Sequence, residues 1–238
     1  MSEKARIGWV VDAQNDFMDP DGRLYVKDLG DDSDPGSVQI VGTLRQAVAW
    51  MHEHCDVVVY TGDWHSYDDE EIDTEAPDPQ KGTYPPHCMG RSSDPLERRG
   101  AEIISEVRPE DPVVLEIGAS HEGARGVAAK AIAEKRPVFI HKNRFDVFAG
   151  NQATEAFLQG LAEILGKPLE FFVVGVARDV CVTQAIDGMQ ARDLDVTALE
   201  DATWGLGLEE ERATLSRWAE KGRVITVEAL PASSQGRA

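Results

Sequence analysis

Short apolar runs alternate with helical patterns along most of the chain, and this alternation limits the possible folds more than any other feature. Residues 7–11, 57–60 and 171–174 form such runs, which are typical of strands buried on both faces. Residues 154–165 instead carry apolar side chains at helical spacing,. Strands that alternate with helices form βαβ units and parallel sheets. The sequence therefore predicts a three-layer α/β/α fold with a mostly parallel central sheet.

Length and the lack of linkers predict one domain. A chain of 238 residues can bury a large core of its own,. No internal repeat or linker interrupts the pattern, so we expect a single domain over residues 1–230 and a disordered tail at residues 231–238,. Residues 66–99 are polar and rich in proline, glycine and acids, which predicts a long loop,.

The charge balance excludes several classes of partner. A net charge of -19 and a pI near 4.6 argue against nucleic acid and anionic membrane surfaces, which both attract basic proteins,. We interpret the acidic residues 68–73 as part of a solvated, exposed loop. No apolar run reaches the roughly 20 residues that span a bilayer, and residues 1–4 begin no signal peptide pattern,. The three cysteines form no CxxC pair, so we expect a cytoplasmic, reducing location,.

Several chemically active residue types follow the predicted strands directly. Asp12 follows the first strand and Asp63 the second, while Lys142 and Cys181 follow later ones. In parallel α/β sheets, ligands bind outside the carboxyl ends of the strands. Because these residues share one edge of the predicted sheet, a common site explains them better than separate roles in turns or on the surface.

Cys181 lies at the start of a predicted helix. The free N–H groups and partial positive charge of a helix N-terminus lower the pKa of a thiol and can hold an oxyanion. Lys142, if placed against the sulfur, would favour the thiolate further. The alternatives are a buried, inert cysteine and a solvated lysine.

Asp63, His65 and His87 form a possible metal-binding set. Asp63 and His65 are two positions apart, so an extended chain would turn both side chains the same way,. Two histidines and one carboxylate suit zinc, iron or manganese. The alternative is a long loop that simply contains a histidine.

These segments resemble the isochorismatase-like cysteine hydrolase superfamily, and within it the nicotinamidase/pyrazinamidase family. They follow the order of that family and span most of the chain. The matching segments are DAQNDF at 12–17, DWH at 63–65, PHC at 86–88, KNRFDVF at 142–148 and GVARDVCV at 175–182.

The resemblance implies a catalytic triad. Asp12 would take the thiol proton and pass it to departing ammonia, Lys142 would hold the sulfur as thiolate, and Cys181 would attack the amide carbonyl. The product of the attack is a thioester that water cleaves. Backbone N–H groups of Ala177 and Cys181 would form the oxyanion hole, and the family places a cis peptide bond just before the residue that matches Ala177.

The resemblance also implies one divalent metal ion on Asp63, His65 and His87, with zinc favoured and iron or manganese as alternatives. In the family this metal holds the pyridine nitrogen and waters, and it distinguishes nicotinamidases from metal-free relatives. Phe17 and Trp64 would pack against the substrate ring, although core packing is the alternative for Phe17.

Departures from the family pattern lie around the expected pocket mouth. Residues 89–93 lack the usual Gln-Gly-Thr run, residues 111–136 look inserted, and Arg178 replaces a smaller residue. The first hypothesis is a nicotinamidase that releases nicotinate and ammonia for NAD salvage. The second is a cysteine hydrolase of another small amide, and the third is a non-catalytic binding protein on the same fold. Family members often assemble, so a homo-oligomer is a further expectation.

Overall fold

The computed structural model describes residues 3–231 and contains one seven-stranded sheet in which every strand pairing is parallel. The strand order is β3-β4-β2-β1-β5-β6-β7. The predicted α/β fold is therefore confirmed. The strands are β1 (Ala5–Val11), β2 (Val57–Asp63), β3 (Val113–Leu115), β4 (Val138–Lys142), β5 (Leu169–Val176), β6 (Asp195–Trp204) and β7 (Arg223–Ile225).

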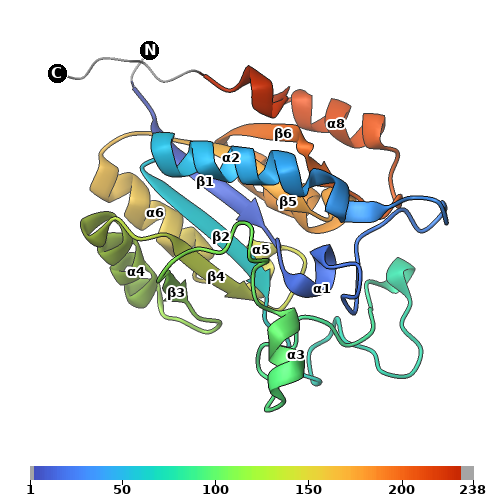
Figure 1. The fold of residues 1–238 in the computed structure, drawn as a ribbon. Helices are drawn as coiled ribbons and strands as arrows, with labels where there is room; N and C mark the ends of the chain where they lie inside the picture. The colour runs from blue at the N-terminus through green and yellow to red at the C-terminus, as the bar shows by residue number, and fades with distance from the viewer. Residues whose placement is uncertain (1–2, 232–238) are drawn as a thin grey trace.

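Helices cover both faces of this sheet, which gives the three predicted layers. In Figure 1, α2 crosses the front of the sheet, while α4 and α6 lie behind it. The α-helices are α1 (Asn15–Met18), α2 (Val41–His54), α3 (Pro95–Gly100), α4 (His121–Glu134), α5 (Val147–Gly150), α6 (Thr154–Leu165), α7 (Thr183–Gln190) and α8 (Glu211–Ala219). Shorter turns are the 3-10 segments η1 (Gly36–Ile40), η2 (Pro79–Lys81) and η4 (Val227–Ala229), and the π turn η3 (Arg178–Val182).

The core divides into two layers because side chains alternate across each strand. Trp9 of β1 packs into the layer beneath α4, α6, α7 and α8. Its neighbour Val10 points the other way, into the layer beneath α2. Gly8 faces α2, where an added Cβ would lie 2.9 Å from the side chain of Met51. The missing side chain lets α2 approach the sheet closely.

The sheet order brings the carboxyl ends of β4, β2, β1 and β5 together. The predicted long loop, residues 66–99, follows β2 and includes η2 and the start of α3. Figure 1 shows α1, α3 and α5 near this end of the sheet. Residues 111–136 contain β3, which extends the sheet at one edge, and α4, which packs against β3 and α6. Apart from Pro231, the predicted tail at 231–238 lies outside the described residues.

Among residues 3–231, no helix combines the length and the apolar character needed to cross a bilayer.

Two glycine-to-alanine substitutions should have opposite effects on the free energy of unfolding. Gly8→Ala should destabilise the protein by about 1–3 kcal/mol, because the new methyl group overpacks the contact with Met51,. Gly126→Ala should stabilise it by about 0.5–1 kcal/mol, because Gly126 lies inside α4 with nothing within 4 Å of an added Cβ,. Urea denaturation measures both values. Equal stability of the two variants would contradict the close packing of α2 on β1.

Candidate active site

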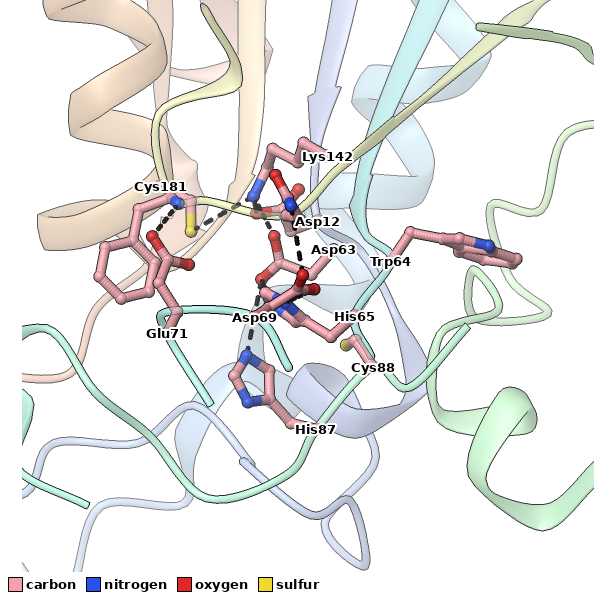
Figure 2. Close-up of polar contacts among 12 residues, drawn as sticks. Asp12, Asp63, Trp64, His65, Asp69, Glu71, His87, Cys88, Lys142 and Cys181 are labelled. Carbon is pink, nitrogen blue, oxygen red and sulfur yellow. Dashed lines mark hydrogen bonds and ion pairs between the residues drawn. The ribbon is translucent and has the colours of Figure 1, made fainter. Parts of the chain in front are cut away.

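Four ionisable side chains from four adjacent strands meet at the carboxyl edge of the sheet. Asp12 directly follows β1, Asp63 ends β2, Lys142 ends β4, and Cys181 lies in the turn η3 after β5. All four are buried, and Figure 2 shows them grouped around the Lys142 ammonium. The sheet order thus brings together residues that the sequence placed after separate strands.

The Lys142 ammonium is the centre of this group. Its Nζ lies 2.9 Å from Asp12 Oδ2 and 3.8 Å from Cys181 Sγ, and it donates a hydrogen bond to Asp63 Oδ1. Burial alone would lower the pKa of Lys142, but the carboxylates of Asp12 and Asp63 raise it well above its usual value,. The charged form of Lys142 is thus favoured by its two buried acidic partners.

The two carboxyl groups have opposite pKa shifts. Burial raises the pKa of Asp12, with the charge of Asp63 adding to this effect and that of Lys142 opposing it. Burial also acts to raise the pKa of Asp63, but the charge of Lys142 and the nearby histidines hold it well below its usual value. Asp12 is therefore the better proton acceptor, while Asp63 stays ionised.

Opposing influences act on the Cys181 thiol. Burial raises the pKa of Cys181 well above its usual value; the charge of Lys142 opposes this, whereas Asp12 and Asp63 add to it,. The sequence expectation considered the helix start and the lysine but neither burial nor the two acids, and the thiolate stays a prediction. The sulfur needs a base to remove its proton, and Asp12 lies beside it: oxygens of Asp12 and Asp63 and the sulfur lie within 4.8 Å of one another.

Three further atoms converge beside the cluster and have no hydrogen-bond partner among the described residues. They are Asp63 Oδ2, His65 Nε2 and His87 Nε2, all buried. Asp63 Oδ2 lies 3.7 Å from each of the two nitrogens. Buried polar atoms without partners indicate a missing ion or water. A carboxylate and two imidazole nitrogens are a suitable donor set for a divalent metal, so these residues fit the implied ion,.

The opposite nitrogen of each histidine is held in place. His65 Nδ1 lies 3.1 Å from Asp69 Oδ2, and His87 Nδ1 lies 2.7 Å from the carbonyl oxygen of Pro85. Such outer partners fix the ring orientation and the tautomer of a metal-binding histidine, leaving Nε2 free to coordinate. Asp69 belongs to the acidic stretch that we interpreted as solvated, so that interpretation was wrong for this residue.

A small, mostly apolar cavity opens onto the nucleophile and the histidine set. Its polar lining comes from Asp63, His87 and Cys181. Phe17 lines it as expected, with its ring centroid 5.3 Å from that of His87. The remaining lining residues are Leu24, Val26, Tyr84, Phe145, Ala177, Val180 and Leu206. Apolar and aromatic side chains thus surround the few polar groups of this cavity.

The structure corrects the predicted role of Trp64 in the pocket. It follows Asp63 at the end of β2, where neighbouring side chains point in opposite directions. Its ring stacks on His141 with centroids 3.9 Å apart, and Figure 2 shows it pointing away from Cys181. Trp64 therefore contributes to packing rather than to the cavity.

The peptide bond Val176–Ala177 is cis, as the resemblance implied. Ala177 and Cys181 both line the cavity, at either end of the tight turn that carries the nucleophile. The Ala177 carbonyl accepts hydrogen bonds from the N–H groups of Val180 and Val182, each at 3.1 Å. The two residues assigned to the oxyanion hole thus lie beside the same cavity, and that role stays a prediction.

Sequence reasoning missed several residues that support the site. The Gln14 amide bonds both backbone groups of Asp63, at 2.8 Å each. The Thr61 hydroxyl bonds Asp12. Glu71, from the acidic loop, accepts a hydrogen bond from Phe145 N–H at 2.9 Å, and burial raises its pKa to about 7. Only Gln14, inside the DAQNDF segment, carried a local signal.

The other two cysteines have no role in this cluster. Burial raises the pKa of Cys55 to about 12 and that of Cys88 well above its usual value. The Cys88 thiol faces the carbonyl of Gly100 at 3.8 Å. Neither thiol is among the residues that line the cavity, whereas Cys181 is.

Comparisons with known proteins agree with this geometry. A family model described as the Isochorismatase domain matches residues 9–229. No curated protein sequence matches the chain. The pyrazinamidase of Pyrococcus horikoshii in complex with zinc is 22% identical, with 93% of this chain and 98% of that chain covered and a TM-score of 0.62.

Two further solved structures are similar. The N-carbamoylsarcosine amidase of Thermoplasma acidophilum is 20% identical, with 96% of this chain and 99% of that one covered and a TM-score of 0.62. PnC1 of L. infantum, in complex with nicotinate, is 20% identical, with 98% of each chain covered and a TM-score of 0.64. At these identities, the likeness establishes the isochorismatase-like hydrolase fold.

Removing the buried ammonium should destabilise the protein strongly. Lys142→Met leaves Asp12 and Asp63 as uncompensated buried acids, so we expect a loss of about 3–5 kcal/mol in the free energy of unfolding at neutral pH,. Urea denaturation in the presence of a chelator measures this loss. The control Lys130→Met, at an exposed position of α4, should change it by less than about 0.5 kcal/mol,. A loss below about 1 kcal/mol for Lys142→Met would contradict the central role of this cation.

Asp69 should affect metal affinity without binding the metal itself. Asp69→Asn weakens the partner of His65 Nδ1, so zinc affinity should fall about 10- to 100-fold,. Competition with a fluorescent chelator measures the affinity. Asp68→Asn, one position away and exposed, is the matched control and should bind zinc as the parent does. Equal affinities for the two variants would refute the role of Asp69.

Proposed function

The chain belongs to the isochorismatase family, and from that premise we propose that it is a metal-containing cysteine amidohydrolase that converts nicotinamide to nicotinate and ammonia. The observation that carries this proposal is the meeting of two groups of side chains beside one cavity, which Cys181 of the first group and Asp63 and His87 of the second line directly. Cys181, Lys142 and Asp12 supply a nucleophile, a cation and a base. Asp63, His65 and His87 supply the donor set that separates nicotinamidases from metal-free relatives.

The first step of the proposed reaction is attack on the amide. Asp12 takes the proton of the Cys181 thiol, and the sulfur adds to the amide carbonyl to give a tetrahedral intermediate. The ammonium of Lys142 lies beside both groups as the negative charge moves from Asp12 to the sulfur. Backbone N–H groups of Ala177 and Cys181 would hold the oxyanion.

The second step releases ammonia, and the third restores the enzyme. Asp12 passes the proton to the amide nitrogen as the C–N bond breaks, which leaves a thioester on Cys181. Asp12 then takes a proton from water, whose oxygen attacks the thioester and forms nicotinic acid, which ionises to nicotinate by giving its proton to ammonia. The proton held by Asp12 returns to the departing sulfur of Cys181, so acid, base and nucleophile end as they began.

Substrate orientation follows from the cavity walls and the histidine set. A divalent ion on Asp63, His65 and His87, with zinc favoured, would supply a Lewis-acidic contact for the pyridine nitrogen. Phe17, Tyr84 and Phe145 provide aromatic surfaces for a flat ring,. We assign this activity to NAD salvage in the cytoplasm, where three unpaired cysteines would stay reduced,.

A related amidase activity on another small amide is the second candidate. It is favoured by the departures at residues 89–93 and at Arg178, and by the fold shared with an N-carbamoylsarcosine amidase. Arg178 forms an ion pair with Glu211 at 2.8 Å, outside the cavity lining. Its effect on substrate choice would therefore be indirect.

The purified protein should release ammonia from nicotinamide, and Cys181→Ala should lower kcat/KM by about 10³-fold or more, because no other group can form the thioester. The measurement is a coupled ammonia assay with added zinc and, in parallel, with chelator, which should reduce the rate. Cys55→Ala, the control for a thiol outside the cavity, should keep the parental rate.

Three outcomes count against this proposal. Activity that survives in Cys181→Ala would exclude the thioester route. Full activity in chelator would exclude a role for the metal. Much faster hydrolysis of N-carbamoylsarcosine or another amide than of nicotinamide would favour the second candidate.

A further inference from the structure

Asp12 is held by a single residue of the neighbouring strand. The Asp12 N–H donates to the Thr61 carbonyl at 3.2 Å, and the Thr61 hydroxyl donates to Asp12 Oδ1 at 2.7 Å. Both residues are buried: Asp12 directly follows β1, which ends at Val11, and Val11 pairs with Thr61 of β2. Thr61 thus contacts the base through both its backbone and its side chain.

These contacts matter because the backbone leaves the strand abruptly at Asp12. Its φ is +48°, in the left-handed region that side chains other than glycine rarely adopt,. The Gln14 N–H bonds the Asp12 carbonyl at 2.7 Å and closes the turn. The position of the Asp12 Cα is therefore set by the turn, but rotation of its carboxyl group is set by side-chain contacts.

The two oxygens of the Asp12 carboxyl have different partners. Oδ1 accepts the Thr61 hydroxyl. Oδ2 lies 2.9 Å from Lys142 Nζ in an ion pair, yet it accepts no well-directed hydrogen bond from any described residue. Figure 2 shows Asp12 beside Lys142 in the same group as Cys181. Oδ2 is thus the oxygen with capacity left for a proton.

We propose that Thr61 is a positioning residue for the hydrolysis: its hydroxyl fixes the rotation of the Asp12 carboxyl group so that Oδ2 faces the thiol. This inference rests on the proposed function. Its step is one proton transfer, in which the S–H bond of Cys181 breaks and an O–H bond forms on Oδ2. The electron pair left on sulfur forms the bond to the amide carbon, and the same proton later leaves with ammonia.

The side-chain chemistry of Thr61 suits this role. Along β2, Thr61 and Asp63 point to the same side of the sheet, because alternate residues do so. An apolar residue of the same shape at this position would fill the space but offer Oδ1 no donor. Oδ1 would then be a buried acceptor without a partner, and the plane of the carboxyl group would lose the contact that sets its tilt,.

The test compares two substitutions at Thr61. Thr61→Val keeps the shape and removes the hydroxyl, whereas Thr61→Ser keeps the hydroxyl and removes a methyl group. For Thr61→Val we expect kcat to fall about 10- to 100-fold with KM within about twofold, because misplacing a base slows the chemical step. For Thr61→Ser we expect kcat within about threefold of the parent. The substrate is the amide that the zinc-loaded parent hydrolyses fastest.

Thr197→Val provides the matched control. Thr197 lies in β6, paired with Phe172, and its buried hydroxyl has no partner among the described residues. This variant makes the same chemical change in the same sheet away from Asp12, so it should keep the parental kcat. Thermal unfolding of all variants shows whether any loss of rate follows a loss of stability.

Each outcome decides one question. Parental kcat in Thr61→Val, an equal loss in Thr61→Ser, or a loss confined to KM overturns the positioning role while leaving the amidohydrolase intact. A loss of rate in Thr197→Val equal to that in Thr61→Val assigns the effect to the sheet rather than to Asp12. A parent that hydrolyses no amide overturns the proposed function and this inference with it.

Discussion

The site depends on one buried cation. The Lys142 ammonium is removed from water and pairs with Asp12 and Asp63 while it lies 3.8 Å from the sulfur of Cys181. A buried charge is tolerated only when its partners are placed accurately. Asp63 ends one strand and Asp12 follows another. The order and register of the strands therefore determine which of these charged groups meet.

The sequence predicted the architecture well, because burial on both faces of a parallel sheet leaves a strong local pattern. It also located Asp12, Lys142 and Cys181 at one edge, since strand ends can be read from that pattern. Prediction from the sequence failed where the role of a side chain depended on residues that pack around it in the fold. Trp64 was assigned to the cavity although the alternation after Asp63 turns it away. The burial of Cys181, which raises the pKa of its thiol, was also not apparent from the sequence, because burial cannot be read from one residue.

Residues that act through long-range contacts were the hardest to predict. Thr61 is one threonine in an apolar strand, and its bond to Asp12 joins positions that are 49 residues apart. Asp69 and Glu71 lie in an acidic stretch whose composition is typical of solvated loops, yet they bond His65 and Phe145. Composition describes the average of a segment, whereas these roles depend on single side chains that turn inward.

Asp63 gives its two oxygens to two different centres: Oδ1 accepts from the Lys142 ammonium, and Oδ2 faces the imidazole nitrogens. Through this one carboxylate, an ion at the imidazole nitrogens and the ammonium beside the nucleophile would share the same negative charge. Linkage makes such a coupling reciprocal: the free energy by which a bound ion changes deprotonation of the Cys181 thiol equals the free energy by which deprotonation changes ion binding. A substitution that adjusts one centre would therefore shift the other.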